Sequence, residues 1–106
     1  MIDITHLDER EIEMIGKCLK AVASGSYFPE WEFETLFGMK LREVAIIAKG
    51  WPKNASVPQA GLAVINTLVN LSGYPHGLER ELEEQAAGPK ELRRLLIKVR
   101  QVRPVE

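Results

Sequence analysis

The chain has 106 residues, of which 45% are hydrophobic and 27% are charged. This composition is typical of one soluble globular domain, here residues 1–106, and excludes a disordered or fibrous protein. Lys and Arg together number 14 against 15 for Asp and Glu, and the net charge of −1 provides no general attraction to nucleic acid or to an anionic membrane. Binding of either kind would need a local patch.

Two features concern the cellular compartment. Cys18 is the single cysteine, so an internal disulfide is excluded. The first residues, MIDITHLDERE, contain neither a basic segment nor an apolar one, and we therefore expect no signal peptide. The cytoplasm is the expected location.

Proline and glycine divide the chain into segments with helical periodicity and short connections. No useful run of alternating apolar and polar residues lies between them, so no strand is predicted. The sequence predicts an all-α, single-domain bundle of about six helices. They are expected at about residues 7–24, 29–37, 40–49, 57–72, 76–87 and 89–102.

The first predicted helix has Thr5 as its expected N-cap, with Asp8 three residues on in a variant capping box. Cys18 falls in the middle of its apolar face, where a thiol usually packs and does not react. We predict no catalytic residue. His6 and His76 are the only histidines, and no paired ligand spacing indicates a metal site or a cofactor.

The second and third predicted helices have apolar residues at helix-turn-helix spacing, with Gly38 at the turn. Two features argue against DNA binding. Glu34 stands where a small residue normally lets the two helices approach. The would-be recognition helix offers only three cations for bases and phosphates, and it also exposes Ile46. We favour a simple helical corner, and we retain a nucleic-acid-binding protein as the alternative. Its candidates are Lys40, Arg42 and Lys49 in this segment, with phosphate contacts from Arg93, Arg94 and Lys98 on the last predicted helix.

The fourth predicted helix, at about 57–72, is the most apolar, with Ser56 as its expected N-cap and Pro58 in its first turn. Apolar residues cover well over half of its surface. An apolar run of about a dozen residues is too short to cross a bilayer, which takes about 20. The helix must therefore be surrounded by the rest of the chain or by a partner, and we expect helices one, three and six to pack on it. Its predicted polar stripe consists of Gln59, Asn66, Thr67 and Asn70.

Asn66 and Asn70 lie one turn apart and are followed by Tyr74 and His76. Side-chain amides at this spacing could hold a ligand. More often such amides satisfy the backbone of a neighbouring turn, and we favour that interpretation. A small-ligand binder or enzyme with a cleft near residues 66–77 is the second alternative.

The last two predicted helices carry opposite charge. The fifth is acidic on its outer face. The sixth is expected to bury Val102 and to expose a basic face. A charged outer face of this kind is usually just solvated. Binding of an acidic protein surface is the second interpretation, and binding of a nucleic-acid backbone is the third. Its exposed residues are predicted to be Arg93, Arg94, Ile97, Lys98 and Arg100.

The runs WEFETLFGMKLREVAIIAKGWP and NTLVNLSGYPHG resemble a group of small uncharacterised bacterial helical proteins. The likeness covers about Trp31 to Gly77 and brings no activity with it, so no role is carried over to any residue. The residues that carry it are Phe33, Leu36, Phe37, Gly38, Trp51, Pro52, Asn66, Asn70, Gly73, Tyr74, Pro75, His76 and Gly77.

The leading hypothesis is a non-enzymatic protein-interaction module of the bacterial cytoplasm that could form homodimers. It depends on the lack of a catalytic constellation, on the balanced charge, and on the expected exposure of Ile46 and Ile97. The partner is a protein of unknown identity, and no membrane partner is expected.

Overall fold

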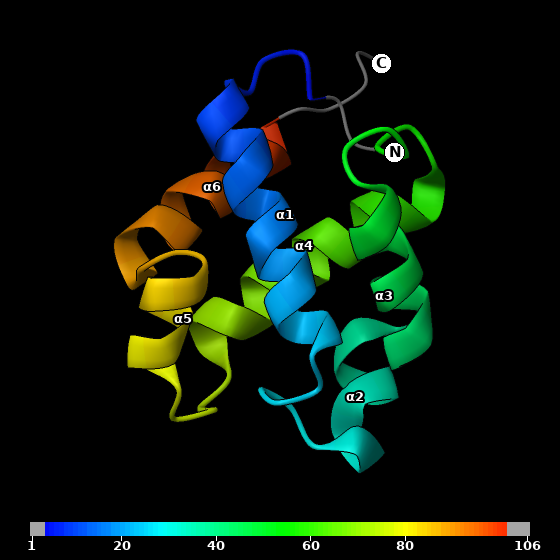
Figure 1. The fold of residues 1–106 in the computed structure, drawn as a ribbon, viewed down its shortest axis with the longest axis vertical. Coiled ribbons are helices and arrows are strands. Elements are labelled where there is room, and N and C mark those ends of the chain that lie inside the picture. The colour runs from blue at the N-terminus through cyan, green and yellow to red at the C-terminus, as the bar shows by residue number, and fades with distance from the viewer. Residues whose placement is uncertain (1–3, 102–106) are drawn as a thin grey trace.

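A computed structural model describes residues 4–101 and contains six α-helices (Figure 1). The all-α fold predicted from the sequence is confirmed, and no strand occurs within residues 4–101. The predicted end of the last helix at Val102 lies outside the described residues. The helices are α1 (Glu9–Ala23), α2 (Glu30–Phe37), α3 (Leu41–Gly50), α4 (Pro58–Gly73), α5 (Glu79–Gln85) and α6 (Pro89–Gln101).

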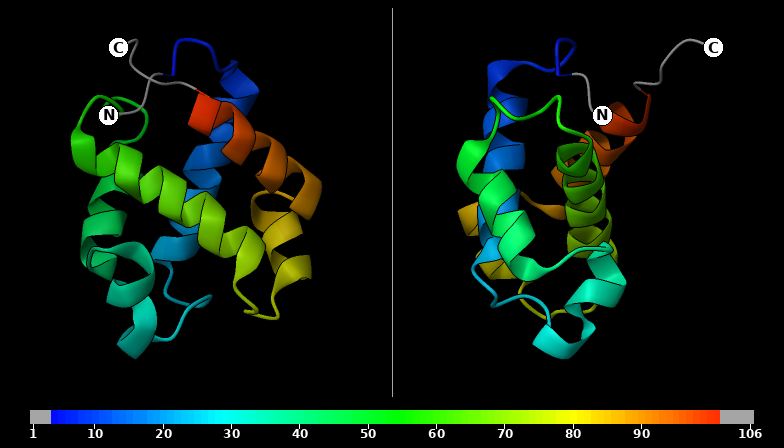
Figure 2. Two further views of the ribbon diagram at one scale, coloured as in Figure 1. Left: turned by 180° about the vertical axis from the view of Figure 1, so that it is seen from behind. Right: turned by 90° about the vertical axis from the view of Figure 1, so that its right-hand side faces the viewer.

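Helix α4 crosses the middle of the molecule. It contacts α1, α3 and α6, as predicted, and also α2. In Figure 1 α1 lies in front of α4. Seen from behind, in the left panel of Figure 2, α4 lies nearest the viewer, between α6 on one side and α2 and α3 on the other. The other helices therefore cover one side of α4 and leave the opposite side uncovered.

The core takes residues from all six helices, and α1 and α4 contribute to its centre. From α1 it takes Ile15, Leu19 and Val22, which recur at helical spacing and are fully buried. From α4 it takes Val64 and Leu68, which are also fully buried. Burying each such side chain stabilises the fold by about 1.5–3 kcal/mol.

Two predicted caps are wrong. Asp8, not Thr5, is the N-cap of α1: its carboxylate accepts a hydrogen bond from the Glu11 N–H at 2.8 Å, and the Glu11 carboxylate accepts one from the Asp8 N–H at 2.9 Å. This complete capping box moves the N-cap three residues along the chain, and the helix starts at Glu9, two residues later than predicted. Helix α4 begins after Val57, not Ser56, and has no side-chain cap; the fixed φ of Pro58 suits the first helical position.

Helix α5 is shorter than the predicted segment 76–87. The His76 ring accepts a hydrogen bond from the Leu78 N–H at 3.0 Å, which holds the chain in a loop until Leu78. At the other end, the Ala86 and Ala87 N–H groups both donate to the Leu82 carbonyl, and this ends the helix at Gln85. The remaining boundaries agree with the prediction to within two residues, which is the usual uncertainty of helix ends.

The predicted polar stripe of α4 does not face solvent as a whole. Thr67 and Asn70 are buried and Asn66 is half-buried, and only Gln59 is exposed. By contrast Leu62 is 46% exposed. The side of α4 that points away from the other helices is apolar.

Candidate interaction surface

Five apolar residues follow one another along the uncovered side of α4, and we call them the outer stripe. They are spaced by three or four residues, which places them on one face of the helix. Leu62 is exposed, and Ile65 and Val69 are half-buried. None of the five has a polar side chain. The outer stripe consists of Pro58, Leu62, Ile65, Val69 and Gly73.

The turn after α2 leaves the outer stripe open. Gly38 ends α2 with a φ of 69°, a left-handed conformation that favours glycine. A Cβ atom at this position would lie 4.0 Å from Leu62 Cδ2, so the turn passes close to the stripe without a side chain that could cover it. Leu62 therefore stays exposed although α2 and α4 are in contact.

Asn66 and Asn70 fasten the end of α2 to α4. The Asn66 Nδ2 group donates to the Phe37 carbonyl at 2.8 Å, and the Asn70 Nδ2 group donates to the Leu36 carbonyl at 3.1 Å and to the Asn66 carbonyl at 2.8 Å. The last carbonyls of a helix have no partner within the helix, and these amides supply one. The donors that a ligand would need are thus used to hold α2.

His76 is held by the loop that contains it. Its side chain is fully buried, Nδ1 accepts the Leu78 N–H, and Nε2 lies 3.0 Å from the Leu71 carbonyl. Because that carbonyl can only accept, the ring proton is on Nε2. Both ring nitrogens are thereby occupied. Nδ1 also lies 3.9 Å from Glu79 Oε2.

Tyr74 is bonded to α2. Its hydroxyl donates to Glu32 Oε1 at 2.8 Å, and this bond to a carboxylate raises the pKa of Tyr74. Tyr74 and His76 border an open hollow of about 340 Å³ together with Ser26, Tyr27 and Pro29, but neither asparagine lines it. The structure does not bring the four candidates Asn66, Asn70, Tyr74 and His76 into one cleft.

The cations proposed for nucleic-acid binding are divided between two sides of the molecule. Lys40, Arg42 and Lys49 lie on α3 or at its start, and all three are exposed. Lys40 and Arg42 border a groove of about 580 Å³ whose lining also includes Glu30 and Glu34, and those carboxylates would repel a phosphate backbone.

Arg93 and Arg94 are exposed on α6. In Figure 1 and in the left panel of Figure 2, α6 and α3 lie on opposite sides of α4. The two groups of cations therefore do not form one basic surface.

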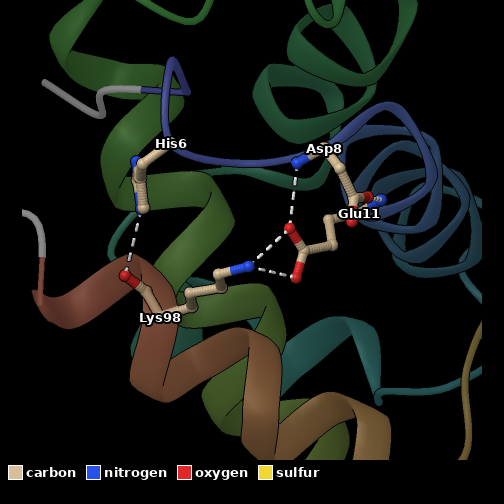
Figure 3. Close-up of polar contacts among 4 residues, drawn as sticks. All are labelled: His6, Asp8, Glu11 and Lys98. Carbon is tan, nitrogen blue, oxygen red and sulfur yellow. Dashed lines mark hydrogen bonds and ion pairs between the residues drawn. The ribbon is translucent and has the colours of Figure 1, made fainter.

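Lys98, predicted to be an exposed cation, is partly exposed and is already paired with a carboxylate. Its Nζ atom lies 2.7 and 2.8 Å from the two carboxylate oxygens of Glu11 (Figure 3). The His6 ring approaches the Lys98 carbonyl at 3.3 Å. We call His6, Asp8, Glu11 and Lys98 the clasp, because they join the start of α1 to α6. The bond from Lys98 and that from the Asp8 N–H lower the pKa of Glu11.

Other reactive groups are also occupied or buried. Cys18 is fully buried, and burial raises the pKa of its thiol to about 12, so the reactive thiolate is scarce at neutral pH. Within the described part of the chain, no three His, Cys, Asp or Glu side chains gather where they could hold a metal ion. None of the helices there is long and apolar enough to cross a bilayer.

Four further large apolar side chains are exposed among the described residues: Val57 just before α4, and one on each of three other helices. Ile46 on α3 and Ile97 on α6 are 68% and 59% exposed, as predicted, and Trp31 on α2 is 81% exposed. Single exposed apolar side chains are normal on a protein surface, whereas several in a row are not. Sequence reasoning missed the outer stripe, although its spacing was visible, because nothing in the sequence shows which side of α4 the chain covers.

Comparison of the chain with protein-family models, with curated proteins and with solved structures finds no match. The likeness to small bacterial helical proteins therefore stays an expectation.

Proposed function

We propose that the chain is a non-enzymatic protein-interaction module of the cytoplasm and that the outer stripe of α4 is its binding face. The observation that supports this proposal is the partly exposed, wholly apolar stripe on the most apolar helix of the fold. Contiguous exposed apolar surface is characteristic of interaction sites, and its burial yields about 25 cal/mol for each Å².

The spacing of the outer stripe also indicates what kind of surface binds it. Apolar residues at intervals of three and four form the seam by which one helix packs on another. Leu62, Ile65 and Val69 have this spacing. The partner is therefore expected to present the apolar face of a helix.

The state of the polar candidates supports binding over catalysis. The amide donors of Asn66 and Asn70 and both ring nitrogens of His76 have partners within the protein. The Cys18 thiol is buried. A catalytic group must reach its substrate, and none of these groups is available to do so.

A photo-cross-linking amino acid placed on the outer stripe tests the proposal. A benzophenone side chain at position 62 is expected to form adducts with protein in a bacterial lysate or in concentrated solution. The matched control carries the same group at Lys20, which is exposed on α1. Helix α1 itself lies on the covered side of α4 (Figure 1). Adducts that are absent, or equally abundant from both positions, would contradict the proposal.

A further inference from the structure

We infer that the partner of the outer stripe is a second copy of this chain, packed with its α4 antiparallel across a two-fold axis that passes close to Ile65. This inference rests on the proposed binding face and adds the identity and orientation of the occupant. A two-fold interface uses the same patch on both subunits, so the patch must fit itself.

The outer stripe fits itself in size when the two copies are antiparallel. An axis between residues 65 and 66 places Leu62 opposite the smaller Val69 of the partner subunit, and Pro58 opposite Gly73 of the partner subunit. Nothing lies within 4 Å of the position that a Cβ atom on Gly73 would take, so that end of the stripe has room for a partner's side chain. Large residues thereby meet small ones at both ends of the seam.

The charges at the two ends of α4 favour the same orientation. Lys53, in the loop just before α4, is exposed and belongs to none of the ion pairs found in residues 4–101. At the other end, Glu79 is 63% exposed in its side chain and borders a small hollow together with Leu71 and Ser72.

An antiparallel pair brings the basic end of each α4 toward the acidic end of the other, twice in each dimer. It also opposes the two helix dipoles favourably. A parallel pair would place like charges together. Charge complementarity of this kind mainly sets orientation and adds little affinity.

The size of the surface predicts a weak dimer. A helix of 16 residues is about 24 Å long, and a strip about 10 Å wide along it covers roughly 240 Å². A stable dimer buries about 800 Å² on each subunit, so neighbouring parts of α6 and of the loop before α4 must contribute as well. We expect a dissociation constant on the order of 10 μM.

Disulfide cross-linking tests the inference, because buried Cys18 does not compete for the oxidant. Ile65→Cys lies beside the proposed axis, and its oxidation is expected to give a covalent dimer with twice the chain mass of 11.9 kDa. Lys20→Cys is the matched control and should stay monomeric. Leu62→Cys mixed with Val69→Cys should form more disulfide than either variant alone, because the antiparallel pair places these two positions opposite each other. A parallel pair would instead place each position opposite itself and favour disulfides within each single variant.

Charge exchange provides a second, independent readout by sedimentation. Lys53→Glu should weaken dimerisation by on the order of fivefold, and adding Glu79→Lys on the same chain should restore it. If the partner were a different protein, adding Glu79→Lys would not be expected to restore the binding that Lys53→Glu weakens.

Two results would overturn the inference. One is a wild-type chain that sediments as a monomer up to about 0.5 mM, far above the expected dissociation constant. The other is an Ile65→Cys variant that oxidises no faster than Lys20→Cys. If the benzophenone at position 62 then labels a different protein, the proposed function stands without the second copy. If it labels nothing, both fail.

Discussion

The two sides of α4 are similarly apolar and differ in what covers them. The inner side, with Ala60, Val64 and Leu68, is fully buried under the other helices. The outer stripe lies on the side that faces away from them, where Leu62 is exposed and Val69 is half-buried (Figure 2). In this small domain the other five helices are too few to cover the whole surface of α4, so part of its apolar surface stays exposed. The uncovered side provides a surface for a partner, and most of the variants below test one side against the other.

The largest effect is expected from Leu68→Ala, which leaves a cavity on the inner side. This substitution should lower the free energy of unfolding by about 3 kcal/mol. Leu62→Ala removes the same atoms from the outer stripe and should cost less than about 1 kcal/mol in dilute solution, because this side chain is already 46% exposed. Urea denaturation of both variants measures the difference. Equal losses would mean that the outer stripe is part of the core.

Asn70→Ala should be the next most costly change, at about 2 kcal/mol, because it removes a buried amide and leaves the Leu36 carbonyl without this donor. The same change at half-buried Asn66, where water can replace the amide, should cost about 1 kcal/mol. Denaturation midpoints at constant m-value give both numbers. If Asn70→Ala leaves the free energy of unfolding unchanged, the amides are not needed to hold α2, and the ligand hypothesis is favoured again.

The clasp should make stability depend on acid pH. Its bonds lower the pKa of Glu11 in the folded state from the ordinary value of 4.5. The stabilisation is therefore present above that ordinary value and is lost as pH falls through the lower, folded value. Lys98 is partly exposed, which limits the effect, so the wild type should lose about 1 kcal/mol more than Glu11→Gln between about pH 6 and about pH 3. Parallel curves for the two proteins would show that the clasp contributes nothing.

The smallest effect is expected from Thr67→Val, and it has the opposite sign. The Thr67 hydroxyl is buried on the inner side without a hydrogen-bond partner. Replacing it by a methyl group of similar shape should raise the free energy of unfolding by about 0.5–1 kcal/mol. Ser72→Ala, at an exposed site, should change it by less than about 0.5 kcal/mol. A destabilised Thr67→Val variant would indicate a partner for this hydroxyl, such as a buried water molecule.

Most of the fold could be predicted because its signals are local. Proline, glycine and the helical period of apolar residues are properties of short segments, and they locate all six helices. The errors in helix ends arose where two local signals compete and the stronger one determines the boundary. Asp8 closes a full capping box that Thr5 cannot close, and the His76 ring holds the Leu78 N–H so that α5 starts late.

The candidate site depends on contacts between distant segments, and these leave no local signal. The sequence predicts Lys98 as an exposed cation on the basic face of α6. In the structure it is paired with Glu11 of α1, which lies 87 positions earlier in the chain. Asn66 and Asn70 could be assigned a bonding role but not a partner, which is the end of α2. The outer stripe is set by where the other five helices stop, and only the assembled fold shows this.

The concentration dependence of the methyl NMR spectrum tests the central claim most directly. If α4 pairs with a second copy, the methyl signals of Leu62, Ile65 and Val69 should shift or broaden as the protein is concentrated from about 10 μM to about 1 mM, which brackets the expected dissociation constant. Signals from Val64 and Leu68 on the inner side should stay unchanged. A spectrum without concentration dependence, or changes confined to Ile46 and Ile97, would contradict the account.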